Sequence, residues 1–380
     1  MIKRTKYLNK IIPFIDKNLI KALIGVRRSG KTVLLTQIKE HLLNNNVDEK
    51  QIIYMNFESF LNRKYLNGLD LYGYIYNISK SLNKKIYLLL DEIQDVKEWE
   101  KAIASLMVDI NCDIYIAGSN SKLLSSELAT HIAGRHVHFE IYPFTFSELK
   151  EYSIQLDRKI SDDDLFNEYL QFGGLPQCFL LDEKQSKSTY LEDIFNTIVI
   201  NDIVERNRII DIELLKRLIV FLLDNIGNPF SGNSLQKALK AGGINTTVNT
   251  IISYISYILK SFVMCSVSRY DTKGKALLST NEKYYSIDLG LRNHIKSSEQ
   301  IDYSKLFENV IYLEMVSRGY KVNVGKVGDY EIDFICYNDN KEKLYRNNKV
   351  RGLFLILSYS FLWGFIGLAF IFLMVLLILK

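Results

Sequence analysis

The chain has 380 residues, enough for two or three domains, and its content of 48% hydrophobic and 24% charged residues is typical of a globular protein. The formal net charge of +5 permits contact with nucleic acid or an anionic membrane but does not by itself indicate either. The four cysteines are far apart and have no metal-binding spacing, as expected for reduced cytosolic thiols, and the apolar run at 11–15 is too short for a secretory signal.

Residues 25–32 match the phosphate-binding loop pattern G-x-x-x-x-G-K-[ST] without a mismatch. A strand pattern at 19–24 precedes the loop and a helical pattern at 33–43 follows it, which is the context that the motif requires. Lys31 can reach the outer phosphates of a nucleotide, and the Thr32 hydroxyl can hold Mg²⁺. The expected nucleotide-binding residues are Gly25, Arg27, Arg28, Ser29, Gly30, Lys31, Thr32 and Val33.

Strand and helix patterns continue to alternate as far as residue 142. The further expected strands lie at 51–56, 85–90, 113–118 and 136–141, and the expected helices between them lie at 99–109 and 122–132. The run at 85–90 is nearly all apolar, as in a parallel strand that is covered on both faces. The pattern predicts an α/β domain with an open parallel sheet that binds its ligand at the carboxyl ends of the strands.

Two acidic residues follow the apolar strand at 85–90. We expect Asp91 to bind Mg²⁺ next to Thr32, and Glu92 to polarise the water that attacks the γ-phosphate. On their own, two acids at a strand end are commonly just solvated. Because they occur downstream of a phosphate-binding loop, they instead indicate a nucleotide hydrolase site in which Lys31 and Glu92 are catalytic.

Two more polar residues are catalytic candidates with open alternatives. Asn120 follows the next strand and could orient the attacking water, or it could cap the helix expected at 122–132. Arg135 could reach the γ-phosphate of a neighbouring subunit in a homo-oligomer, or it could be a solvated arginine after the helix-ending Gly134.

These motifs resemble those of the AAA+ ATPase superfamily, and most closely a prokaryotic family that joins an AAA+ domain to a C-terminal domain of unknown function. The resemblance covers residues 1–336. Besides the phosphate loop, it rests on Leu90-Asp91-Glu92-Ile93-Gln94, Gly118-Ser119-Asn120, Gly134-Arg135, Tyr142-Pro143-Phe144-Thr145-Phe146-Ser147-Glu148-Leu149 and Phe172-Gly173-Gly174-Leu175-Pro176. It implies an ATP site made of Lys31, Thr32, Asp91 and Glu92, with Asn120 as the first sensor and Arg135 as the finger. A second sensor arginine has no match in the sequence.

Residues 151–300 are expected to form a mostly helical and winged-helix-like domain. The Gly-Gly-Leu-Pro run at 173–176 is interpreted as a structural joint. Ser231 or Ser234 can cap a short helix, and a second helix at 246–260 precedes a β-hairpin with its tip at 273–275. The expected inward stripe of the second helix is Val248, Ile252, Ile255 and Leu259. The helix could enter a DNA groove, but its few basic residues favour a protein-interaction or packing module.

Residues 301–346 pair a helix containing Glu308 with a strand at 331–335, and the resemblance implies a partial, nuclease-like α+β region. A working restriction-endonuclease core needs clustered acids and a further acid-x-Lys on the next strand. At 343–348 the chain reads K-L-Y-R-N-N instead, so we do not expect nuclease activity.

The segment from Leu353 to Leu379 contains no charged residue. As a helix it would be about 40 Å long, enough to cross a hydrocarbon core of about 30 Å. We expect a transmembrane helix at 353–379 that anchors a cytoplasmic body to the inner membrane, with the basic residues before the span on the cytosolic side. Because the family pattern stops near Tyr345, a frame change or gene fusion could also have supplied this tail.

The sequence therefore predicts a P-loop ATPase domain over residues 1–150, followed by the three regions described above. The expected function is ATP binding and Mg²⁺-dependent hydrolysis that acts on a protein or DNA partner. Two alternatives stay open: a non-catalytic nucleotide-dependent switch or DNA-binding regulator, and a membrane-tethered adaptor whose ATP site only drives assembly.

Overall fold

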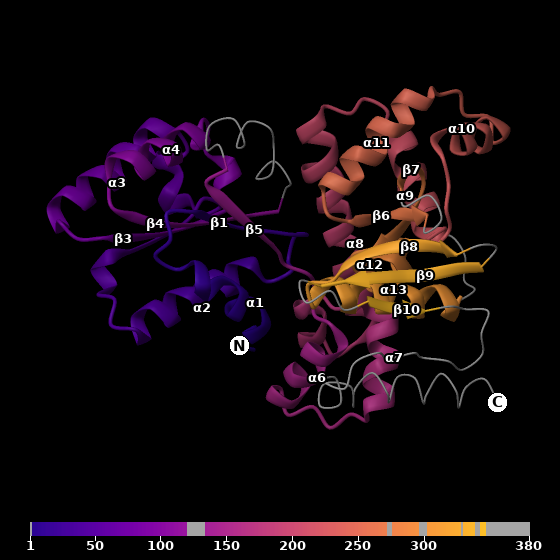
Figure 1. The fold of residues 1–380 in the computed structure, drawn as a ribbon, viewed down its shortest axis with the longest axis horizontal. Coiled ribbons are helices and arrows are strands. Elements are labelled where there is room, and N and C mark those ends of the chain that lie inside the picture. Colours follow the sequence, from indigo (N-terminus) through magenta and orange to yellow (C-terminus); the bar gives the residue numbers. More distant parts are fainter. Residues whose placement is uncertain are drawn as a thin grey trace.

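The chain forms two bodies that lie side by side, an amino-terminal body around one sheet and a carboxyl-terminal body of helices and a second sheet (Figure 1). This computed structural model describes residues 2–119, 134–271, 276–295, 302–327, 330–338 and 343–346. The helix expected at 122–132 and the candidate Asn120 lie outside these residues.

All five predicted strands of the amino-terminal body are present, and they pair in parallel in the order β2-β3-β4-β1-β5. Their bounds are Ile20–Ile24 for β1, Ile52–Asn56 for β2, Ile86–Asp91 for β3, Cys112–Gly118 for β4 and His136–Glu140 for β5. Every residue of β3 is buried, as its apolar sequence predicts. Because β4 separates β1 from β3, the phosphate loop and the Asp91 carboxylate lie two strands apart at the same edge of the sheet.

Helices cover both faces of this sheet (Figure 1). One face is covered by α1 (Thr5–Ile11) and α2 (Lys31–Asn44), and the other by α3 (Gly68–Leu82) and α4 (Trp99–Asp109). Short 3₁₀ turns lie at Ile12–Phe14, Glu49–Gln51, Phe60–Tyr65 and Ile93–Asp95. The two apolar layers hold the sheet between the helices, and the loops that follow each strand lie at its carboxyl edge.

The predicted helical region starts at Thr145, whose side chain forms a capping box with Glu148 at the beginning of α6. The helices are α6 (Phe146–Gln155), α7 (Asp162–Phe172), α8 (Lys184–Thr197), a π-helix (Ile198–Glu205), α9 (Ile212–Asp224), α10 (Gly232–Ala241) and α11 (Val248–Lys260), with a 3₁₀ turn at Pro176–Leu180. Ser231 caps α10, with Ser234 as its capping-box partner, which settles the choice between these two serines. The π-helix continues α8 without a break, and no motif in the sequence predicts it.

The apolar stripe predicted on α11 is partly wrong. The buried residues of this helix are Ile251, Ile255 and Ile258. Ile252 is 54% exposed instead of buried, and Val248 and Leu259 are only partly buried. Val248 and Ile252 lie beside Gly232 of α10, so they contact the neighbouring helix at the surface and not the core.

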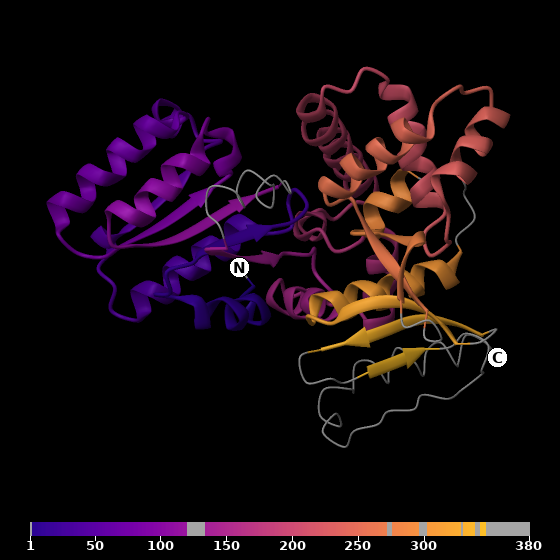
Figure 2. The same ribbon diagram turned by 45° about the horizontal axis from the view of Figure 1, so that its top comes forward.

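The second sheet combines the predicted hairpin with the strands that follow residue 320, in the order β10-β9-β8-β6-β7 (Figure 2). Its strands are β6 (Met264–Asp271), β7 (Ala276–Ser286), β8 (Lys321–Val327), β9 (Tyr330–Tyr337) and β10 (Lys343–Arg346), and the helices α12 (Leu289–Ile295) and α13 (Tyr303–Ser317) connect β7 to β8. β6 and β8 pair in parallel, and the other neighbours are antiparallel. One continuous core therefore extends across the boundary that the sequence suggests at residue 300.

Glu308, a residue of the expected nuclease-like region, has structural partners. Its carboxylate accepts hydrogen bonds from Tyr285 Oη at 2.6 Å and Lys283 Nζ at 3.3 Å. Among the described residues there is no cluster of three His, Cys, Asp or Glu side chains that could hold a metal ion.

The predicted membrane span at 353–379 lies outside the described part of the chain. Within that part, no helix is both long and apolar enough to cross a bilayer. The transmembrane helix therefore stays a prediction from the sequence.

Candidate nucleotide site

The phosphate loop connects the carboxyl end of β1 to the first turn of α2, as its motif predicts. Gly25 has a φ of 150°, and a Cβ atom there would lie 2.3 Å from the carbonyl oxygen of Ile141. Gly30 has a φ of 98° and caps α2. Only glycine fits the first position, and the left-handed backbone favours glycine at the second, so the loop can turn its N–H groups toward an anion at the positive end of the helix.

Lys31 is buried and its ammonium group lies against the loop itself. Its Nζ donates hydrogen bonds to the carbonyl oxygens of Gly25 at 3.0 Å and Val26 at 2.9 Å. Burial lowers the pKa of Lys31, while the negative charges of Glu92 and Asp91 act in the opposite direction. The lysine is therefore held by two carbonyls and can exchange them for phosphate oxygens.

Asp91 and Thr32 are brought together, as the sequence predicts for a metal site. Asp91 is fully buried at the end of β3, and burial raises the pKa of its carboxyl to about 6, against the opposing effect of a hydrogen bond from the Thr32 hydroxyl. Asn56, at the end of β2, donates a hydrogen bond from its Nδ2 to Asp91 Oδ2 at 3.3 Å. Because a bound cation would favour the charged carboxylate, the Thr32 and Asp91 oxygens fit a Mg²⁺ ion that keeps several waters.

The phosphate loop also contains a buried hydroxyl group that has no hydrogen-bond partner among the described residues. Ser29 is fully buried, and its Oγ makes no hydrogen bond to any described residue. A buried hydroxyl without a partner is costly, and a phosphate oxygen would satisfy it. The residues of the loop thus fit a phosphate group as well as a metal ion.

Glu92 follows Asp91 with a left-handed backbone, at φ 53°. Its carboxylate accepts a hydrogen bond from Gln94 Nε2 and a longer one, 3.5 Å, from Ser119 Oγ at the end of β4. A strained backbone is tolerated where the surroundings hold it and is common at functional sites. Here it turns Glu92 toward the neighbouring strand end, where a catalytic carboxylate is expected.

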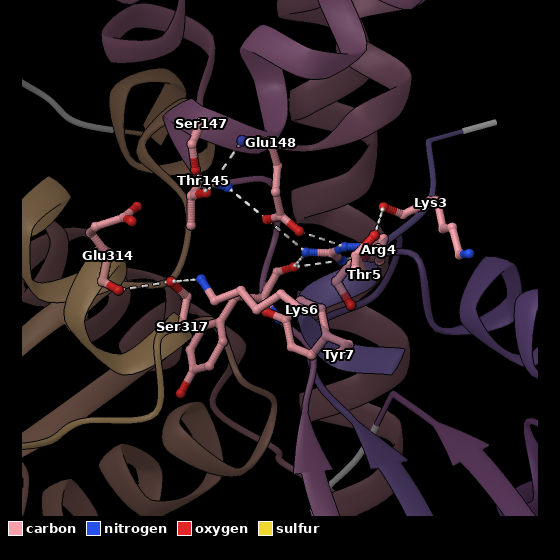
Figure 3. Close-up of polar contacts among 12 residues, drawn as sticks. Lys3, Arg4, Thr5, Lys6, Tyr7, Thr145, Ser147, Glu148, Glu314 and Ser317 are labelled. Carbon is pink, nitrogen blue, oxygen red and sulfur yellow. Dashed lines mark hydrogen bonds and ion pairs between the residues drawn. The ribbon is translucent and has the colours of Figure 1, made fainter. Parts of the chain in front are cut away.

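A buried arginine from the amino terminus contacts both the phosphate loop and Glu148 of α6, and Figure 3 shows its contact with Glu148. Arg4 forms a two-bonded ion pair with Glu148 of α6, with both N–O distances 3.0 Å. Its Nη1 also donates to the carbonyl oxygen of Ser29 at 2.8 Å, and both Nη atoms donate to that of Tyr142 at 3.0 Å. Arg4 therefore connects the phosphate loop to the first helix of the carboxyl-terminal body.

A second arginine connects the loop to that body from the other side. Arg27 Nε lies 3.3 Å from Asp202 in the π-helix, and its Nη1 lies 3.1 Å from Glu58. Burial alone would lower the pKa of Arg27, but Asp202 raises it above its ordinary value. The guanidinium is therefore held by carboxylates beside the nucleotide site.

The structure does not bring the other two catalytic candidates of the sequence to this site. Asn120 lies outside the described residues. Arg135 is exposed and directly precedes β5, whose first residue pairs with Ile20 at the start of β1. This is the amino edge of the sheet, opposite the phosphate loop, so Arg135 cannot reach the nucleotide of its own chain.

The sequence analysis missed Arg4, Asn56 and Asp202. Asn56 could have been suspected because it ends a predicted strand at the same sheet edge as Asp91. Arg4 and Asp202 lie 25 and 175 residues from their partners Ser29 and Arg27, and no local pattern marks them.

Comparison with known families defines the class of protein. Residues 17–150 match a family described as an AAA domain, and residues 163–302 match a domain of unknown function. With the parallel sheet and the phosphate loop, these matches identify a P-loop nucleotide-binding protein of the AAA class that carries a second, carboxyl-terminal domain.

The chain belongs to the same family as an uncharacterised protein of Haemophilus influenzae. The two are 39% identical over 336 residues, which cover 88% of this chain and 84% of the relative. An uncharacterised protein of Methanocaldococcus jannaschii is 31% identical over 353 residues, which cover 90% of this chain and 77% of the relative.

The fold also resembles a solved structure, the Walker-type ATPase PABY2304 of Pyrococcus abyssi. The TM-score is 0.55 at 14% identity, and the match covers 78% of this chain and 96% of that protein. The predicted α/β P-loop fold and its union with a domain of unknown function are thus confirmed. The winged-helix and nuclease-like interpretations and the apolar tail remain predictions.

Proposed function

We propose that this protein binds ATP with Mg²⁺ and hydrolyses it. The observation that carries this proposal is the convergence of Lys31, Asp91 and Glu92 at one sheet edge, beside a loop whose glycines match phosphate-binding geometry. Ions and phosphates bound there would compensate the burial of these charged groups.

Each residue has a distinct part in the proposed reaction. Lys31 and the loop amides hold the β- and γ-phosphates, and Thr32 and Asp91 would hold Mg²⁺, which supplies charge neutralisation when bound. Glu92 orients and polarises the attacking water, and Ser119 and Gln94 keep its carboxylate in position.

Substitution of Lys31 and Glu92 tests the proposal. Lys31→Ala is expected to abolish ATP binding, because the cation that faces the outer phosphates is lost. Glu92→Gln should bind ATP normally but lose turnover by about 10²- to 10⁴-fold. The measurements are calorimetric ATP binding and phosphate release in the presence of Mg²⁺.

Lys39→Ala is the matched control, because Lys39 lies on the same helix but pairs with the exposed Glu49. It should leave binding and turnover unchanged. Full turnover by Glu92→Gln would remove Glu92 from its role, and ATP binding by Lys31→Ala would refute the proposed site.

The energy of hydrolysis would act on a protein or DNA partner. The region of α9–α11 and the β6–β7 hairpin is the proposed contact surface for such a partner. If the protein is instead a non-catalytic nucleotide switch, a single-turnover experiment will show bound ATP that is never converted to ADP.

We also propose that Arg135 acts in a neighbouring subunit. The support is its exposure at the sheet edge opposite its own phosphate loop. Mixing Lys31→Ala chains with Arg135→Ala chains tests this, since mixed oligomers alone would contain sites with both residues. Attachment of this cytoplasmic body to the inner membrane through 353–379 remains a proposal from the sequence.

A further inference from the structure

One buried carboxylate of the carboxyl-terminal body holds two arginines next to the phosphate loop. Asp202 lies in the π-helix and its side chain is only 1% exposed. Its Oδ2 lies 3.3 Å from Arg27 Nε, and its Oδ1 lies 3.4 Å from Arg27 Nη2 and 3.0 Å from Arg206 Nη2. A single negative charge is therefore shared by two positive charges.

The arginines have more donors than this carboxylate can satisfy. Arg206 Nη1 is buried and makes no hydrogen bond to any residue that the structure describes. The remaining carboxylate on Arg27 comes from Glu58, whose side chain is 53% exposed and is easily replaced by another anion. A guanidinium with a free buried donor is suited to a planar, bidentate contact with phosphate.

The cluster adjoins the nucleotide site, because Arg27 is a residue of the phosphate loop and Arg206 shares the Asp202 carboxylate with it. The carboxyl of Asp95, four residues after Asp91, has its pKa raised by burial and by Glu92, and Arg206 opposes that shift. The negative charge of Asp202 raises the pKa of Lys31, and that of Glu92 raises the pKa of Arg27, in both cases against the effect of burial. The two arginines therefore share their surroundings with the catalytic lysine and carboxylates.

The backbone that carries Asp202 is unusual. A π-helix of this length is rare, and π-helical turns are concentrated at functional sites. It extends from Ile198 to Glu205 and places Asp202 and Arg206, which follows its last residue, on the side of the loop.

We propose that Arg27 and Arg206 bind the terminal phosphate of ATP, and that Asp202 is a positioning residue that holds both arginines until the nucleotide replaces it. This inference rests on the proposed ATP site. It adds a specificity for triphosphate over diphosphate, and it links nucleotide binding to the π-helix and α8.

The proposal makes opposite predictions for the two kinds of residue. Removal of Arg206 removes a ligand of the terminal phosphate, so ATP affinity should fall while ADP affinity does not. Removal of the Asp202 charge removes a competitor for the same arginines, so ATP affinity should rise. A purely structural ion pair would not give these opposite effects.

The test is calorimetric titration of the full chain with ATP and with ADP, in the Glu92→Gln background so that ATP persists. Arg206→Ala should weaken ATP binding about tenfold and leave ADP binding within about twofold. Asp202→Asn should tighten ATP binding severalfold. If the alanine variant does not fold, Arg206→Lys replaces it in the test. Because lysine keeps the charge but cannot make a bidentate contact, it should show a smaller loss of ATP affinity than expected for alanine.

Arg217→Ala is the control, because Arg217 forms an exposed ion pair with Glu213 on α9 and is assigned no part in nucleotide binding. Equal loss of ATP and ADP affinity in the Arg206 variants, or no tightening in Asp202→Asn, would overturn the inference. Lys31→Ala, titrated in parallel, separates the two hypotheses: if it still binds ATP the proposed site itself is wrong, and if it does not, only the arginine assignment has failed.

Discussion

Arg4 has almost no contact with solvent, and its guanidinium is matched on every side by acceptors and rings. Besides the Glu148 carboxylate and two carbonyl oxygens, the Tyr7 ring centroid lies 4.4 Å from its Cζ and that of Phe144 lies 5.3 Å away. An isolated buried charge is very unfavourable, whereas a fully matched pair can be neutral. The stability of the loop therefore depends on both members of the pair together (Figure 3).

The first stability prediction concerns this pair. Arg4→Met or Glu148→Leu alone should lower the free energy of unfolding by about 3–5 kcal/mol, because each leaves the partner buried and unpaired. The double variant should lose clearly less than the sum of the two. Urea unfolding of the four proteins measures this coupling.

The pair Arg217 and Glu213 supplies the comparison, since both side chains are more than half exposed. Its single substitutions should each change stability by at most about 1 kcal/mol. Strict additivity for Arg4 and Glu148 would contradict the account of a mutually dependent buried pair.

At the scale of the secondary-structure elements, the turn after α7 contains two glycines that other parts of the chain approach closely. Gly173 has a φ of 74°, and a Cβ there would lie 2.1 Å from Asp288 Oδ1. A Cβ on Gly174 would lie 2.1 Å from the carbonyl oxygen of Phe144, and its N–H donates to Asp288 Oδ2 at 2.7 Å. The predicted joint at 173–176 is thus the point where the AAA domain, α7 and α12 meet.

Alanine substitutions test this tight packing. Gly174→Ala should destabilise the protein by several kcal/mol or prevent folding, because backbone atoms block the new methyl group. Gly73→Ala is the matched control, since Gly73 lies inside α3 with open space around it. It should raise stability by up to about 1 kcal/mol, as expected for glycine in a helix. Similar effects of the two substitutions on thermal unfolding would argue against the close approach.

The elements that were predictable from the sequence are those determined by local patterns. The strands of the first sheet and helix α4 have apolar runs and turn residues that set their bounds, and the phosphate loop has a contiguous motif. The stripe on α11 was misplaced because two helices share its surface, so burial depends on α10 as well as on the core.

The same limit applies to the site. Lys31, Asp91 and Glu92 follow from motifs, because each is adjacent to a strand end that the sequence reveals. The contact between Arg27 and Asp202 depends on how the carboxyl-terminal body packs against the sheet, and the π-helix has no known local signal. Long-range ion pairs of this kind are set by tertiary packing and not by neighbouring residues.

On the scale of the whole molecule, the phosphate loop lies at the junction of the two bodies. Val26 of the loop and Ile2 are buried in the hydrophobic core of the carboxyl-terminal body, whereas the rest of the sheet has its own two cores. A cavity of about 680 Å³ between β5, β6 and α13 leaves the junction loosely filled on one side. Contacts at the loop therefore join the two bodies.

This arrangement predicts that ATP alters the carboxyl-terminal body as well as the sheet domain. Amide hydrogen exchange of the Glu92→Gln chain should slow on ATP binding in α2 and in α6, which contacts the loop through Arg4. It should also slow in the π-helix, because Arg206 directly after it would bind the terminal phosphate. At an ATP concentration about one hundred times Kd, binding should raise the free energy of opening by up to about 2.7 kcal/mol. This applies to any segment whose amides exchange only after the nucleotide has dissociated. Helix α10, which packs against α11, is the internal control and should exchange at an unchanged rate. Protection confined to α2 and the β strands would mean that the two bodies respond independently, because the contacts of Arg4 and Arg206 would then transmit no binding energy.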